Sequence, residues 1–337
     1  MAGAVHFGLW YDFRNPAPWR QEPEHFYAQR LEQIADAEAA GFDSVWLTEH
    51  HFCDDGYTPS PLVLAGAIGA RTRRMRIGTN LMLLPLHDPV RLAEDGATLS
   101  LTTGGRFDLG LGSGYRQLEF DQFQRKLSHR PSLVEEGVEI IRRAWSGERV
   151  EFRGKRFTVR NLRITPTPVH TPDILLGGMQ VRPIERAARI ADGFLCTGGI
   201  GLDVYVEALR KLGRSPADGK IVLGCWAIIA EDPEREAARI GDHVLYQINE
   251  YVKWGAFGPP DQTPLFADAA TAIERGLYEL WDADAAVDQL GRLVRQYPMI
   301  RDIHFWAQFP GEPVESGTRR LRYIAEMVLP RLRKDDR

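Results

Sequence analysis

The sequence lacks several features that mark specialised classes of protein. It has only three cysteines, Cys53, Cys196 and Cys225, and their spacing matches neither a disulfide framework nor a metal-binding motif. No apolar run reaches the roughly 18 residues of a membrane span. The first residues show no basic region followed by an apolar one, so we expect no signal peptide. These absences favour a cytoplasmic protein with reduced thiols and no membrane partner.

An excess of basic charge is also missing. The chain has 42 Lys and Arg against 46 Asp and Glu, which gives a net charge of −4. This balance provides no positive surface for nucleic acid. A hydrophobic fraction of 44% in 337 residues is typical of a globular protein with a large core. The length allows two domains, but α/β barrels reach this size as one domain.

Strand-like and helix-like segments alternate along the chain. Residues 5–11 alternate between apolar and less apolar side chains and predict a strand, and residues 27–38 have helical spacing with Gly41 as the stop. This alternation favours a parallel sheet, and the predicted fold is a single (β/α)₈ TIM barrel with insertions. An open doubly wound sheet is the alternative, but no GxGxxG turn follows the first strand. Further strands are expected at 43–50, 75–83, 107–111, 174–176, 194–196, 221–230 and 303–309.

Two segments interrupt the alternation. Residues 148–172 predict a hairpin followed by a proline-rich linker. Residues 247–275 are rich in glycine, proline and aromatic residues, and we interpret them as a long excursion that forms a lid or a pocket wall. Two helix starts are also predicted: Asp88-Pro89 combines a capping residue with a first-turn proline, and Ser132 to Glu135 has the form of a capping box.

Three predicted strands end in polar or glycine-rich residues. Glu49–His51 follow the second strand, His87-Asp88 follow the third, and Gly112–Gly114 follow the fourth. Parallel α/β enzymes build their sites at the carboxyl ends of the strands. The sequence therefore predicts an active site there.

The residues around these strand ends resemble the bacterial luciferase-like flavin monooxygenase superfamily. GFDSVWLTEHHF at 41–52 is similar to the second strand of that family and its Glu-His-His-Phe end. LLPLHDPVRLAED and GRFDLGLGSGY are similar to the segments at its third and fourth strands. The similarity is dense over residues 5–115, looser to residue 200, and architectural beyond.

The resemblance implies an enzyme that binds reduced FMN at the mouth of the barrel. Such a monooxygenase uses O₂ to form a peroxyflavin, which oxidises a small, largely uncharged organic substrate, and a separate flavin reductase supplies the reduced flavin. The segment 247–275 would exclude water from this intermediate. The resemblance also suggests a homodimer formed through helices near the second and third strands, where residues 61–71 are rich in Ala and Gly.

His50 matches the catalytic histidine of the family, and imidazole suits proton transfer near neutral pH. Asn80 and Leu81 match the place of a cis peptide beneath the flavin ring. Gly112, Ser113 and Gly114 would lie near the ring. Luciferase has a cysteine and a phosphate-binding arginine where Gly112 and Ser113 stand, so light emission is not implied.

The turn after the 174–176 strand would hold the FMN phosphate through backbone amides at a helix start. Its candidate residues are Gly177, Gly178, Met179, Gln180 and Arg182.

The substrate pocket has weaker candidates, each of which could equally be a core residue. His51 follows His50 and would point to the opposite side of an extended strand, so we expect no metal site from this pair. The candidates for the pocket are Tyr11, His51, Trp254, Phe257, His304 and Trp306.

Two other functions stay open. A deazaflavin-dependent oxidoreductase with the same barrel would transfer a hydride and would not react with oxygen. A non-catalytic flavin-binding accessory subunit would lack the site histidine or the phosphate turn, but candidates for both are present here.

Overall fold

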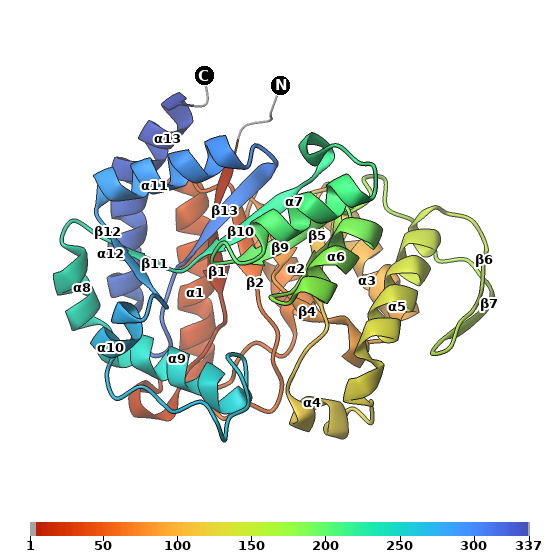
Figure 1. Ribbon diagram of the computed structural model, residues 1–337, viewed down its shortest axis with the longest axis horizontal. Helices are drawn as coiled ribbons and strands as arrows, with labels where there is room; N and C mark the ends of the chain where they lie inside the picture. Colours follow the sequence, from red (N-terminus) through yellow and green to blue (C-terminus); the bar gives the residue numbers. More distant parts are fainter. Residues whose placement is uncertain (1–4, 336–337) are drawn as a thin grey trace.

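The computed structural model describes residues 5–335 and shows a closed parallel barrel surrounded by helices (Figure 1). The strands follow the order β3-β2-β1-β13-β10-β9-β8-β5-β4, and β3 also pairs with β5, which closes the sheet. Because β3 and β4 share one position, the nine strands give eight barrel positions, and the predicted (β/α)₈ fold is confirmed. The strands are β1 (His6–Tyr11), β2 (Ser44–Leu47), β3 (Arg76–Thr79), β4 (Met82–Leu83), β5 (Phe107–Gly112), β8 (Ile174–Gly177), β9 (Gly193–Thr197), β10 (Ile221–Cys225) and β13 (Ile300–Trp306).

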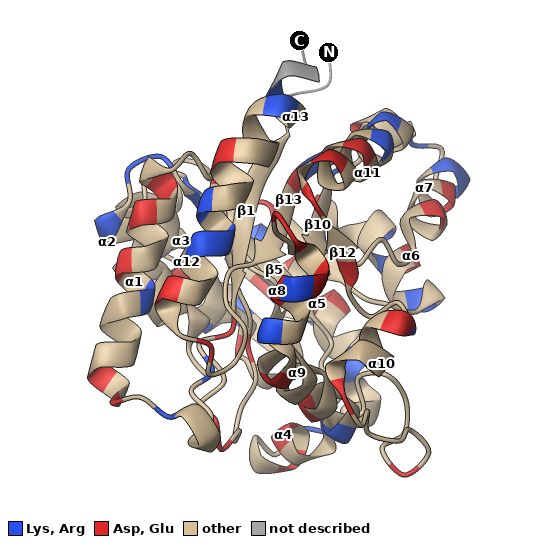
Figure 2. Ribbon diagram, turned by 90° about the vertical axis from the view of Figure 1, so that its left-hand side faces the viewer, with Lys and Arg blue, Asp and Glu red and all other residues tan. Residues whose placement is uncertain are grey.

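Helices surround the barrel, and many of the charged residues lie on them (Figure 2). The apolar faces of the helices pack on the outside of the sheet and form the main core. Within the described residues, no helix is both long and apolar enough to cross a lipid bilayer. The surrounding helices are α1 (Pro23–Ala39), α2 (Pro61–Arg71), α3 (Pro89–Thr102), α5 (Arg130–Trp145), α6 (Val181–Ile190), α7 (Leu202–Lys211), α11 (Ala283–Gln296), α12 (Val314–Tyr323) and α13 (Leu329–Asp335).

Of the two predicted helix starts, one is confirmed and the other is wrong. The Asp88 side chain accepts hydrogen bonds from the backbone amides of Val90 and Arg91, and Pro89 begins α3. Ser132 does not cap α5, because that helix already begins at Arg130. The Ser132 hydroxyl instead donates to the carbonyl of His129.

Two predicted strands are divided. The 75–83 strand breaks at Asn80-Leu81, which is joined by a cis peptide bond. The 221–230 strand breaks at Trp226, whose side chain lines a cavity described below. Beyond this break, β11 (Ala227–Ile229) leaves the barrel and pairs with β12 (Glu279–Trp281) in a separate two-stranded sheet.

The two insertions are both present, but the second is more helical than predicted. β6 (Val150–Arg153) and β7 (Thr158–Leu162) form the expected antiparallel hairpin. The first part of the 247–275 segment belongs to α9 (Gly241–Trp254), and α10 (Ala269–Glu274) follows a loop. Val244, Ile248 and Val252 recur at helical spacing and are buried, which explains α9. In Figure 1, α4 (Gln117–Gln122), α9 and α10 lie at the end of the barrel opposite both termini.

The barrel wall is closely packed where β5 approaches the end of β3. The Thr79 hydroxyl donates to the carbonyl of Gly110 at 2.7 Å and accepts from its amide at 2.9 Å. A β-carbon on Gly110 would lie only 1.8 Å from the carbonyl oxygen of Thr79. Glycine is therefore needed at this position for the two strands to approach each other.

We predict that Gly110→Ala lowers the free energy of unfolding by about 1–3 kcal/mol or more, because the new methyl group forces the backbone apart. Gly66→Ala in α2 is the matched control, since its β-carbon would meet its nearest neighbour at 3.8 Å. That helical substitution should raise stability by about 0.5–1 kcal/mol. Urea unfolding of the two variants tests the difference, and equal midpoints would contradict it.

Candidate active site

A cavity of about 1100 Å³ opens at the carboxyl ends of the barrel strands. Its wall includes residues of β1, β8, β9 and β10 and of the loops that follow β2 and β5. Pockets for single drug-sized ligands measure roughly 300–1,000 Å³. The space is therefore large enough for a coenzyme and a small substrate together.

His50 lies in the cavity wall and is held by a buried carboxylate. Its Nδ1 is 2.8 Å from Oε1 of Glu119 on α4, and its Nε2 is 3.3 Å from the hydroxyl of Tyr115. The same Glu119 oxygen accepts from the backbone amide of His51 at 2.9 Å and from Arg116 Nη1 at 3.1 Å. Glu119 thus fixes the imidazole and the loop that carries it.

The surroundings of His50 favour one tautomer. Burial lowers the pKa of His50, and the hydrogen bond and charge of Glu119 only partly offset this effect. With Nδ1–H donating to the carboxylate, Nε2 carries the lone pair, an assignment that follows from the hydrogen-bond network. His50 can therefore accept a proton at Nε2.

Asn80 joins the cavity to the barrel interior. Its side-chain nitrogen lies 2.8 Å from Nε2 of His304, and its carbonyl accepts from Nε1 of Trp10 at 3.1 Å. His304 Nδ1 is in turn 3.4 Å from Asp302. The Asn80 side chain therefore already has a partner beneath the cavity, while Asn80 and Leu81 both contribute to the cavity wall.

The two glycine-rich turns follow neighbouring strands of the barrel, because β5 pairs with β8. Ser113 and Gly114 line it after β5, and the residues from Gly177 to Gln180 line it after β8. Gly112 is covered by Leu81, because a β-carbon there would lie 2.4 Å from the leucine side chain. Arg182 is exposed in the first turn of α6, outside the lining. Gly112 and Arg182 were thus predicted at the site but are not part of the wall.

Among the predicted pocket residues, Phe257 lines the cavity and Trp254 lies behind His50. The Trp254 ring centroid is 5.1 Å from that of His50 and 4.6 Å from the Arg116 guanidinium carbon. Trp254 therefore packs against the catalytic candidate from outside the lining.

The other pocket candidates lie elsewhere. Tyr11 points away from the barrel interior, and its hydroxyl donates to Gln33 of α1 at 2.9 Å. Trp306 stacks on Trp10 with ring centroids 4.3 Å apart, and His304 lies under Asn80. Successive side chains of a strand point to opposite sides of the sheet. Trp10 therefore faces the barrel interior, and its neighbour Tyr11, which was the predicted pocket residue, does not. His51 forms a hydrogen bond to Glu49 and does not line the cavity.

Several lining residues were not predicted from the sequence. They include Arg130 at the start of α5, whose Nη1 donates to the carbonyl of Gly114 at 2.6 Å. No local pattern marks Arg130, because it reaches the cavity only through the position of its helix. The unpredicted lining residues also include six aromatic ones: Trp10, Tyr57, Tyr115, Trp226, Tyr251 and Trp281.

Residues 5–297 match the family model of the luciferase-like monooxygenases, and the chain therefore belongs to this family of oxidoreductases. The resemblance noted in the sequence is thereby confirmed.

Among the relatives, the F420-dependent glucose-6-phosphate dehydrogenase of Microbacterium testaceum is 28% identical over 88% of this chain and 91% of its own. The monooxygenase RslO1 of Streptomyces bottropensis has a similar structure, with a TM-score of 0.82 and 23% identity over 97% of this chain and 99% of its own. An F420-dependent secondary alcohol dehydrogenase reaches a TM-score of 0.75 at 17% identity, also over 97% of this chain and 99% of its own. The chain is thus similar both to proteins named as F420-dependent dehydrogenases and to one named as a monooxygenase.

We predict that Glu119→Gln lowers the free energy of unfolding by about 1–3 kcal/mol, because buried donors then lose a charged acceptor. Glu139→Gln is the control, since Glu139 is half exposed on α5 and forms an ion pair with Arg143. Its effect should stay within about 0.5 kcal/mol. Thermal or urea unfolding measures both, and a Glu119→Gln variant as stable as the control would show that the carboxylate does not hold the loop.

Proposed function

We propose that the protein is an oxidoreductase that transfers a hydride between a deazaflavin coenzyme and a small, largely uncharged organic substrate. The observation that carries the proposal is the Nε2 lone pair of His50 in the cavity wall, 3.3 Å from the Tyr115 hydroxyl, with Nδ1 held by Glu119. When an alcohol carbon gives a hydride to the coenzyme, its hydroxyl must lose a proton, and His50 would accept it. The products are a carbonyl compound and the reduced coenzyme. The curated dehydrogenase relative supports the choice of coenzyme.

The residues of the cavity fit such a coenzyme. The amino-terminal end of α6 has no side-chain cap, so its backbone amides are available to a phosphate group. Arg130 brings a positive charge to the same cavity. The Asn80-Leu81 segment would support the ring, and the bound deazaflavin would supply the hydride acceptor.

The wall around His50 indicates the chemical class of the substrate. The ring centroids of Tyr57 and Tyr115 lie 4.9 Å and 5.4 Å from that of His50. Trp226 and Phe257 also line the cavity. This aromatic surface suits an apolar or aromatic alcohol or carbonyl compound better than a sugar phosphate.

An FMN-dependent monooxygenase is the second candidate. It is favoured by the Glu-His-His-Phe end of the β2 segment, which resembles the flavin branch of the family. In that case a reductase partner would supply the reduced flavin, and His50 would serve in proton transfer. The accessory-subunit hypothesis is disfavoured, because both the site histidine and the turn before α6 line the cavity. A homodimer through α2 and a cytoplasmic location stay predictions.

The two candidates differ in their need for oxygen. We would mix the protein anaerobically with oxidised deazaflavin and a panel of uncharged secondary alcohols and follow the visible absorbance of the coenzyme. Loss of that absorbance with formation of the ketone supports hydride transfer. Substrate oxidation only with reduced FMN and air would overturn it in favour of the monooxygenase.

We predict that His50→Gln lowers kcat by about 10²–10⁴-fold, the usual contribution of a positioned general base. Coenzyme affinity should change only a few-fold, because His50 serves the proton of the substrate. Stopped-flow turnover and equilibrium titration separate these effects. Unchanged turnover in the variant would remove His50 from the mechanism.

We predict that Arg130→Gln weakens binding of a phosphate-bearing coenzyme by about 10–100-fold, the equivalent of one charge-assisted hydrogen bond. Arg182→Gln should bind it within a few-fold of the original chain, because Arg182 is exposed outside the cavity lining. Fluorescence titration with FMN and with the deazaflavin measures both. The reverse order of effects would place the phosphate at Arg182.

A further inference from the structure

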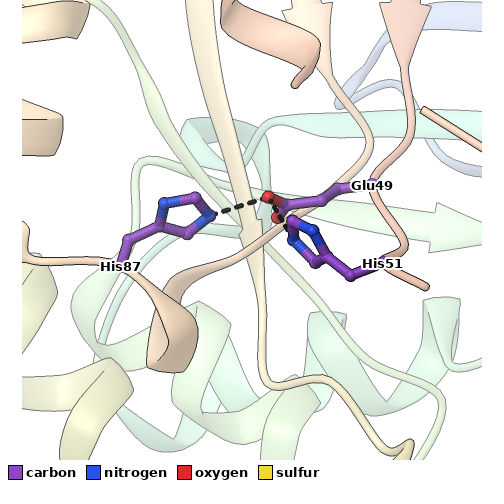
Figure 3. Close-up of side chains that lie close together, drawn as sticks. All are labelled: Glu49, His51 and His87. Carbon is purple, nitrogen blue, oxygen red and sulfur yellow. Dashed lines mark hydrogen bonds and ion pairs between the residues drawn. The ribbon is translucent and has the colours of Figure 1, made fainter. Parts of the chain in front are cut away.

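A carboxylate and two imidazoles converge beside the coenzyme cavity (Figure 3). Oε1 of Glu49 lies 2.8 Å from Nε2 of His87 and 3.1 Å from Nε2 of His51. The other carboxylate oxygen accepts from the backbone amide of Leu83. One ligand atom from each of the three side chains lies within 4.8 Å of the others. We propose that Glu49, His51 and His87 bind one divalent transition-metal ion of the Zn²⁺ class.

The donor set is suited to such an ion. Two imidazole nitrogens and one carboxylate oxygen are a frequent ligand set for zinc, with a fourth position left for water. Neutral imidazole can carry its proton on Nδ1, which frees both Nε2 atoms to bind. Metal–ligand distances of about 2.0–2.2 Å place the donors slightly beyond hydrogen-bond distance of one another. A small outward movement of the two rings would therefore admit the ion.

The charge around Glu49 also favours a cation. Its side chain is fully buried, and within residues 5–335 its ion-pair partners are the two histidines, with no Lys or Arg among them. A buried carboxylate without a fixed positive partner is costly. A bound dication would supply that charge.

The position of the cluster suggests what the ion does. Glu49 and His51 flank His50 in the loop after β2, and His87 precedes α3. An ion bound to all three would join this loop to the amino-terminal end of α3. It would therefore stabilise the loop that carries His50. His50 itself would not be a ligand of the ion.

The test is binding of Co²⁺ and Zn²⁺ to the full chain after dialysis against a chelator. We expect one ion per chain, a visible d–d spectrum of four-coordinate Co²⁺, and a melting temperature that rises with added Zn²⁺. His87→Gln and His51→Gln should each weaken binding by about 10–100-fold or more. His25→Gln, an exposed histidine of α1, is the matched control and should bind as the original chain does.

Two results would overturn the site. The first is Co²⁺ that binds the original chain but does not show the visible spectrum of a four-coordinate ion. This measurement does not require that any variant folds. The second is unchanged affinity in His87→Gln, with circular dichroism showing that the variant is folded. In either case Glu49 would be a hydrogen-bond acceptor for two histidines and nothing more.

Discussion

Closure of the barrel between β3 and β5 is the constraint on which the other features depend. Ile77 pairs with Phe107 and Gly78 with Asp108, and Thr79 is bonded to Gly110 just beyond them. Because every strand of the closed sheet runs in the same direction, all their carboxyl ends meet at one mouth. Residues far apart in the sequence, from Trp10 to Phe257, line one cavity for this reason.

Buried carboxylates also hold the loops at this mouth in place. Glu119 fixes the loop after β2 through His50 Nδ1, the amide of His51 and the side chain of Arg116. Glu49 connects the same loop to His87 before α3. A loop held by such interactions keeps an imidazole in one orientation, and preorganisation of this kind is what proton transfer requires.

Much of the fold followed from the sequence, because alternation of strands and helices determines a parallel barrel. The strand-end motifs lie at the end of the barrel where the cavity opens. What could not be predicted depends on three-dimensional packing. Both faces of β1 are buried, so the sequence did not reveal that Trp10 faces inward and Tyr11 outward. Arg130 lies at the start of α5 and reaches the cavity only through the position of that helix.

The excursion at 247–275 shows a related difficulty. Its prolines and aromatic residues hid the helical spacing of α9, whose Trp254 packs against His50 and whose Tyr251 packs against Tyr57. The Glu49–His87 contact likewise joins two loops that no local pattern connects. The sequence thus indicated which residue types are available, and the fold determined which side chains meet.

In the proposed function, the cavity at the barrel mouth holds a flavin-type coenzyme against His50. A crystal structure of the protein soaked with the reduced deazaflavin, with FMN as the parallel soak, tests it most directly. We expect the ring system over Asn80-Leu81 beside His50, with the phosphate between Arg130 and the start of α6. A coenzyme bound elsewhere, or no binding of either coenzyme in solution or crystal, would contradict it.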